Sequence, residues 1–195
     1  MSDLDVYIAH KVEIEMKAFL IITLGILINL KKTHANDLSI GMQNQTISIE
    51  DNLGKREKLS GIPKLINFNF NQDLKILRTM ARVSYESINL TSNKNSTLDG
   101  SIIRFGGGIG FYQFYLLGLM GLGNTNIKKE GIKASYNNTS GLINLGYEYY
   151  LWKRLILRTE IQYEFVNLAG TKTQYFDSAY IGNSLRYGVS FGFVF

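Results

Sequence analysis

The chain contains no cysteine, one proline and two histidines among its 195 residues. The absence of cysteine excludes a disulfide framework, a thiolate metal site and a cysteine nucleophile. The single proline, together with 19 glycines and 12% aromatic residues, is typical of a β-rich chain and not of a helical or disordered one. A chain of this length is expected to form one domain.

Clustered positive charge is also missing. The net charge is +5, and no run of Lys or Arg exceeds two residues outside the mixed segment KREK at 55–58. Nucleic-acid binding requires a face on which basic residues gather. We therefore expect no nucleic-acid partner.

The N-terminal region has the layout of a secretory signal peptide. Lys17 precedes an apolar run of 13 residues at 18–30, and a small-residue site at 33–35 ends in Ala35. A spanning helix needs about 20 apolar residues, more than this run contains. Lys31 and Lys32, just before the cleavage site, do not suit a signal peptide, so a buried or membrane-anchoring helix is the alternative. We expect translation to begin at Met16, with 1–15 as an extension, 16–35 as the signal peptide and 36–195 as the mature barrel domain.

Beyond residue 36 the hydrophobic pattern has a period of two almost throughout, which predicts β-strands. The connections alternate between long and short, so an antiparallel up-and-down meander would place all long loops at one end and both termini at the other. An even strand number with this loop arrangement is the layout of transmembrane β-barrels. The eight predicted strands are 38–49, 63–70, 74–90, 101–111, 114–126, 140–150, 155–168 and 184–195.

One face of most predicted strands is apolar and the other is polar. In the seventh, Leu157 and Ile161 alternate with Arg158 and Glu160, whereas the fifth, at 114–126, is apolar on both sides and its faces stay unassigned. A soluble sandwich or lipocalin-like barrel would show the same alternation with its apolar face inward. Alternation alone therefore does not separate the two arrangements.

Three features favour the inverted arrangement, in which the apolar face meets lipid. The polar positions carry many glycines, which a narrow eight-stranded lumen needs because bulky side chains share it with small ones. Aromatic residues gather near the strand ends, as in the girdles of outer-membrane barrels. A closed barrel also leaves no unpaired sheet edge in lipid. The predicted girdle at the tight-turn end comprises Phe68, Phe70, Phe111, Tyr112, Tyr115, Tyr149, Trp152, Phe193 and Phe195.

Inversion places the charged side chains in the lumen. Buried charges must be paired, and five arginines against four glutamates come close to balance. We expect Arg–Glu networks that plug the lumen, because water-filled channels need many more strands. The predicted lumen network comprises Arg78, Arg82, Glu86, Arg104, Glu148, Arg158, Glu160, Glu164 and Arg186.

With these features, residues 36–195 resemble the small eight-stranded outer-membrane β-barrels of the OmpA, OmpX and opacity-protein kind, the porin-family β-barrel domain. The predicted signal peptide, the amphipathic strands and the final FGFVF carry the resemblance. It implies integral insertion in the outer membrane of a Gram-negative bacterium. It further implies that the last strand is read by the barrel-assembly machinery, through Tyr187, Phe191, Phe193 and Phe195.

The resemblance implies a structural or surface-interaction role of the adhesin or opacity type. Expected partners are outer-membrane lipid and lipopolysaccharide, the assembly machinery, and a host or surface ligand at the long loops. Basic loop residues suited to anionic partners are Lys55, Arg56, Lys58, Lys128, Lys129 and Lys133.

Two alternatives are an outer-membrane lipid-modifying enzyme and a soluble periplasmic lipocalin-like ligand-binding barrel. Acyl transfer and hydrolysis usually rely on a histidine base, and both His10 and His34 precede the expected cleavage site. We therefore expect no enzymatic activity, no cofactor and no imidazole metal site.

Overall fold

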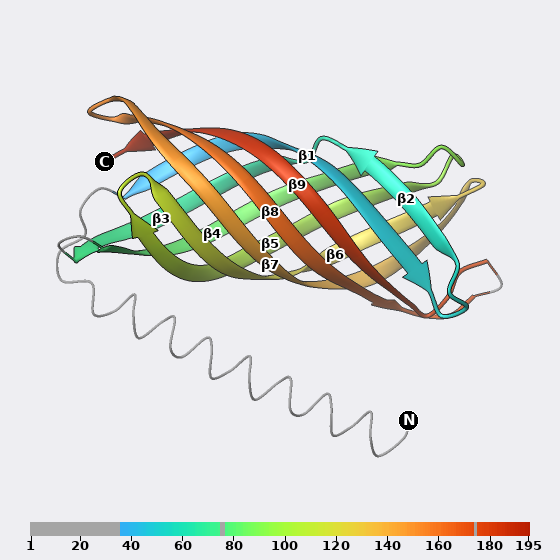
Figure 1. Cartoon of the computed structure of the whole chain (residues 1–195). Coiled ribbons are helices and arrows are strands. Elements are labelled where there is room, and N and C mark those ends of the chain that lie inside the picture. The colour runs from blue at the N-terminus through green and yellow to red at the C-terminus, as the bar shows by residue number, and fades with distance from the viewer. Residues whose placement is uncertain (1–35, 75–76, 174) are drawn as a thin grey trace, which may run out of the picture. The chain divides into compact units, whose positions relative to one another are not determined.

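The computed structural model describes residues 36–74, 77–173 and 175–195, which form one closed β-sheet (Figure 1). Its strands are β1 (Asp37–Asp51), β2 (Arg56–Gly61), β3 (Lys64–Leu74), β4 (Leu77–Thr91), β5 (Thr97–Phe111), β6 (Phe114–Lys129), β7 (Ile132–Trp152), β8 (Leu155–Gly170) and β9 (Ala179–Val194). Within those ranges there is no helix long and apolar enough to cross a membrane. The predicted signal peptide and N-terminal extension lie outside the described residues.

β2 and β3 together form a single strand of the barrel wall. Both pair with β1 in one continuous register, in which Gln45 faces Gly61 and Met42 faces Lys64. Pro63 separates the two segments because proline has no N–H to donate to the ladder. β9 pairs along the whole of β1 and closes the ring. The described chain is thus an eight-stranded antiparallel up-and-down barrel, as the sequence predicted.

The strands extend further at the long-loop end than the sequence predicted. Residues 56–61, expected in the first loop, form β2, and most of residues 127–140, expected in the third, belong to the β6–β7 hairpin. Its two-residue turn is Glu130 and Gly131, both with the positive φ that such turns require. The prediction of a long third loop was wrong. The outward residues of these strands are polar because they face water and not lipid, and such residues are also common in loops.

The two faces of the wall exchange character along the barrel axis. Near the tight-turn end the outward residues, such as Leu145 and Phe191, are apolar and exposed, whereas the inward residues are polar or charged. Toward the long loops the outward residues become polar, such as Asn44 and Thr139, and the inward residues become apolar. The lower zone therefore has the inverted pattern of a membrane barrel, and the upper zone has the ordinary pattern of a soluble one.

The apolar outward residues of the lower zone form a belt around the barrel, called here the lipid belt. Eight of the nine predicted girdle residues lie on the outward face or in the turns of this zone; Tyr112, Tyr149 and Trp152 are among the exposed ones. Tyr115 is the exception: only 2% of it is exposed, and its hydroxyl donates a hydrogen bond to Glu160. The assignment of Tyr115 to the girdle was wrong. Both faces of β6 are apolar, so the alternation does not show which of its residues point into the lumen.

Both termini of the barrel meet at the tight-turn end (Figure 1). The backbone N–H of Phe195 donates to the carbonyl oxygen of Asn36 at 2.9 Å, so the pairing of β1 and β9 extends to the last residue. The Phe195 ring also lies 5.8 Å from that of Phe68 on β3. The C-terminal aromatic residues Phe191, Phe193 and Phe195 all point outward into the lipid belt.

Candidate functional site

Four buried charges in the upper lumen form a closed ring, called here the upper charge ring. Arg104 on β5 contacts Glu86 on β4 and Glu164 on β8, and Arg186 on β9 contacts the same two carboxylates. The Arg104 Nη2 to Glu164 Oε1 distance is 2.5 Å, and the Arg186 Nη1 to Glu86 Oε1 distance is 2.7 Å. Each side chain is 4% exposed or less, so the ring is closed to solvent and electrically neutral.

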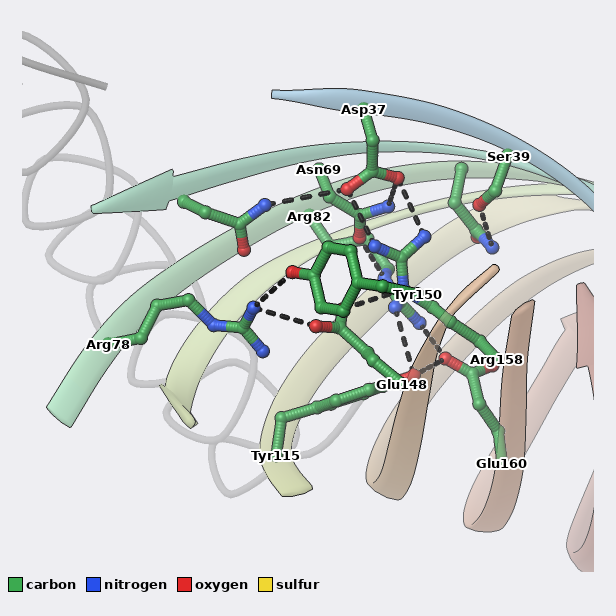
Figure 2. A network of polar contacts seen from close by, with 12 residues as sticks. Asp37, Ser39, Asn69, Arg78, Arg82, Tyr115, Glu148, Tyr150, Arg158 and Glu160 are labelled. Carbon is green, nitrogen blue, oxygen red and sulfur yellow. Dashed lines mark hydrogen bonds and ion pairs between the residues drawn. The ribbon is translucent and has the colours of Figure 1, made fainter. Parts of the chain in front are cut away.

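A second network fills the lumen nearer the tight turns (Figure 2). Arg158 donates from both terminal nitrogens to the two carboxylate oxygens of Asp37, each at 2.6 Å, and from Nε to Glu148 at 2.8 Å. Arg78 binds the same Glu148 at 2.6 Å and also donates to the Tyr150 hydroxyl at 3.3 Å. The two-pronged contact with Asp37 is the strong form of an arginine–carboxylate pair.

Arg82 links this network to the centre of the barrel. Its Nε donates to Asn69 Oδ1 at 2.6 Å, and its Nη1 donates to Glu160 Oε1 at 2.5 Å. The Asn69 amide in turn donates to Asp37 at 2.8 Å. The guanidinium carbon lies 5.5 Å from the centre of the Tyr115 ring, within cation–π range. β1, β3, β4, β6 and β8 are therefore tied together across the lumen by side chains.

All nine residues that the sequence assigned to the lumen lie on inward positions, and each contacts at least one opposite charge within 4 Å. Sequence reasoning missed Asp37, which shares its phase on β1 with the buried Ser39 and Gln43. Asp37 completes the balance, because the lumen then holds five arginines and five carboxylates. The two-residue alternation does place Asp37 on the inward face. It was missed because the first predicted strand began one residue later, at 38.

Inward glycines make room for these large side chains. A Cβ atom on Gly146 would lie 2.0 Å from the Tyr115 ring, and one on Gly110 would lie 2.9 Å from Nε of Arg78. The glycine-rich polar face thus follows from the packing of a narrow lumen.

A small cavity lies among the lumen side chains. Between the upper charge ring and Arg82 lies a cavity of ≈ 10 Å³, lined by Glu86, Arg104 and Gln162 among others. A water molecule needs roughly that volume. Apolar side chains fill the sector beside it; they are Met80, Tyr115, Leu117, Leu119 and Leu142.

A buried apolar cluster, called here the apolar cap, lies in the lumen on the long-loop side of the upper charge ring. Loop residue Phe176, between β8 and β9, folds into it and is 3% exposed. The Tyr136 hydroxyl holds this loop by donating to the Asp177 carbonyl at 2.9 Å. Besides Phe176, the apolar cap comprises Ile47, Ile49, Leu59, Ile88, Leu90, Leu98, Ile102, Ile127, Tyr136, Val166, Leu168 and Tyr180.

Glu57 on β2 links the end of β6 to the β4–β5 loop at the mouth above the apolar cap. Lys129 Nζ lies 3.1 Å from its carboxylate, and the Ser92 hydroxyl donates to it at 2.8 Å. Burial acts to raise the pKa of Glu57, but hydrogen bonds from Ser96, Ser92 and Lys129 outweigh it and hold the pKa below its ordinary value. Glu57 is therefore ionised at neutral pH.

The remaining predicted loop cations lie at the surface of the upper zone. Arg56 pairs with Glu50 at 2.6 Å in an exposed contact, and Lys128 faces Lys133 directly across the β6–β7 hairpin. Across the described ranges no group of three or more His, Cys, Asp or Glu side chains is arranged to hold a metal ion.

No protein-family model matches the sequence, and no curated protein matches it. Solved structures with a similar fold include Ail, the attachment invasion locus protein of Yersinia pestis, in complex with the heparin analogue sucrose octasulfate. That match has 15% identity and a TM-score of 0.46, and it covers 83% of this chain and 100% of Ail.

Neisserial surface protein A matches at 12% identity and a TM-score of 0.46 over 78% of this chain and 95% of that one. The outer membrane protease OmpT of Escherichia coli matches at 8% identity and a TM-score of 0.40 over 84% and 97%. The described residues combine a closed ring of eight wall strands, a lipid belt and a charged interior. This is the architecture of the small β-barrels of bacterial outer membranes.

Proposed function

We propose that the protein is an integral outer-membrane barrel of a Gram-negative bacterium, with a structural or surface-interaction role and a plugged lumen. The observation that carries the proposal is the filled interior, where five arginines pair with five carboxylates beneath the apolar cap. A pore would need a continuous water-filled path through the barrel. Barrels with such a path have many more strands than the eight found here.

The exposed lipid belt counts against a soluble lipocalin-like barrel. A ligand-binding barrel in water buries its apolar face around the ligand, whereas here Ile143, Leu145 and Ile161 point outward and Asn144, Glu160 and Gln162 point inward. In water this arrangement would leave large apolar patches exposed. In a bilayer it is the stable one, because the closed ring satisfies the backbone and the belt meets lipid.

A non-enzymatic role is part of the proposal. The lumen carboxylates and arginines contact one another, so none is left as a base or an electrophile toward a substrate. The long-loop end offers contacts of another kind: Leu53 is 88% exposed, and Tyr175 is 59% exposed. Such groups at the outer tip suit contact with another surface.

The test of the plugged lumen is conductance. Purified protein that migrates differently before and after boiling is added to planar bilayers, and single-channel current is recorded. We expect no large stable current while the heat-dependent mobility shift is present. A stable open state of porin size from protein that shows the shift would contradict the proposal.

The test of the surface role uses the exposed tip. Cells carrying the double substitution Leu53→Ser and Tyr175→Ser should bind host cells or matrix less than the wild type at equal surface abundance. Substitution of the exposed Asn93 by Ala serves as the control and should leave binding unchanged. Equal binding by all three would leave the structural role as the function.

A further inference from the structure

A patch of polar side chains, all but one of them uncharged, lies directly above the lipid belt on β5, β6 and β7. We call it the polar panel; it comprises Asp99, Ser101, Asn124, Asn126, Asn137 and Thr139. All six point outward, and all are exposed or half-exposed. Asp99 is the single charged member, and the amide of Asn126 donates to its carboxylate at 3.3 Å.

The register places the panel in ordered rows. Ser101, Asn124 and Asn137 are direct neighbours across the three strands, and Asp99 faces Asn126 in the next row toward the loops. In the row below, Thr139 faces Leu122, an exposed residue of the lipid belt. The panel is therefore continuous with the surface that meets acyl chains.

Two exposed amides stand at the centre of the panel. They belong to Asn124 and Asn137, which point outward to the surface. Each amide offers two donors and a carbonyl acceptor, and the two side chains stand side by side across the strands. A pair of neighbouring sugar hydroxyls presents the complementary donor and acceptor.

The charge of the panel favours the sugar hydroxyl groups of a lipid headgroup over its phosphate groups. Phosphate groups attract Lys and Arg, but on these strands the outward lysines, Lys128 and Lys133, stand at the hairpin tip, farther from the belt than the panel. Within the panel the one charged group is the carboxylate of Asp99, which would repel a phosphate. Neutral hydroxyl groups carry no such cost.

We propose that the polar panel binds the saccharide headgroup of outer-leaflet glycolipid through hydrogen bonds to its sugar hydroxyls. The inference rests on the proposed outer-membrane location, because there the acyl chains against the lipid belt hold their own saccharide at the level of the panel. It differs from binding to loop lysines in chemistry: contacts between neutral groups do not depend on ionic strength, whereas ion pairs weaken with salt.

The test compares vesicles of three compositions: phospholipid alone, phospholipid with lipid A, and phospholipid with lipopolysaccharide that carries inner-core sugars. The midpoint of the heat-dependent mobility shift is measured for each. For the wild type, core sugars should raise the midpoint over lipid A by on the order of 5 °C. The double substitution Asn124→Ala and Asn137→Ala should lose most of this rise but match the wild type in phospholipid.

Two controls identify the chemistry. The double substitution Lys128→Gln and Lys133→Gln should keep the full rise, and so should the wild type in about 0.5 M NaCl. The inference is overturned if the alanine variant gains as much as the wild type, or if salt or the lysine substitutions abolish the rise. Insertion without any rise also overturns it and leaves the proposed function standing, whereas failure to insert in all vesicles contradicts the proposed function itself.

Discussion

Replacing Glu164 by glutamine removes one of the two carboxylates in the upper charge ring while keeping the shape of the side chain. Glu164 contacts both Arg104 and Arg186 and is 0% exposed. The variant leaves two buried guanidinium groups with Glu86 as their shared carboxylate. Two positive charges would then face each other in a space without room for a hydration shell.

The expected loss is large because the remaining charges cannot reach water. Removing one partner of a buried ion pair costs about 3–5 kcal/mol. The exposed pair of Glu50 and Arg56 provides the comparison, with side-chain exposures of 39% and 74%. Glu50→Gln should cost about 0–1 kcal/mol, since solvent screens such pairs.

The free energy of unfolding is measured by urea titration of the barrel folded into phospholipid vesicles. A third variant, Glu164→Gln with Arg104→Gln, restores the charge balance and should recover part of the loss. A loss below about 1 kcal/mol for Glu164→Gln, equal to that of Glu50→Gln, would refute the reasoning. It would mean that the ring is hydrated and that the lumen is not a packed plug.

Two further predictions concern the wall and the outer mouth. Gly108→Ala should destabilise the barrel by about 1–3 kcal/mol, because a Cβ there would lie 1.8 Å from the Leu116 carbonyl oxygen, whereas Gly118→Ala, with nothing within 4 Å, should be neutral or slightly stabilising in the same urea titration. Because the folded-state pKa of Glu57 is lowered, its contribution to stability is fully present above the ordinary value of 4.5 and is lost as the pH falls through the folded-state value. Glu57→Gln should therefore narrow the stability difference between neutral and acid pH, and an unchanged pH profile would contradict this assignment.

Much of the lower zone could be predicted from the sequence because two constraints act together there. Lipid outside and a narrow lumen inside force strict alternation. The sequence therefore shows directly that Leu157 on β8 points outward and Arg158 points inward. In the upper zone water replaces lipid, and outward positions carry Asn, Ser and Thr, which are also common in loops. The strand character of residues 132–139 was hidden for that reason.

The apolar cap could not be predicted for a related reason. Its members, such as Ile47, Ile88 and Val166, share the phase of the lumen charges on their strands and would be read as exceptions to a polar face. The inward face changes from polar to apolar along the barrel axis. This change becomes visible only when the strand register places the apolar residues of different strands at the same height. Tyr115 was misplaced because β6 lies against apolar groups on both sides, Leu142 inside and lipid outside.

The most direct test of the account is the local environment of three residues at different positions on β7. The sequence has no native cysteine, so Leu145→Cys, Asn137→Cys and Leu142→Cys can each carry a single spin label. In the inverted barrel a lipid-soluble relaxation agent should reach the label at 145, a water-soluble agent should reach the label at 137, and neither should reach the label at 142. Water-soluble quenching at 145 with lipid-soluble quenching absent would contradict the inverted barrel.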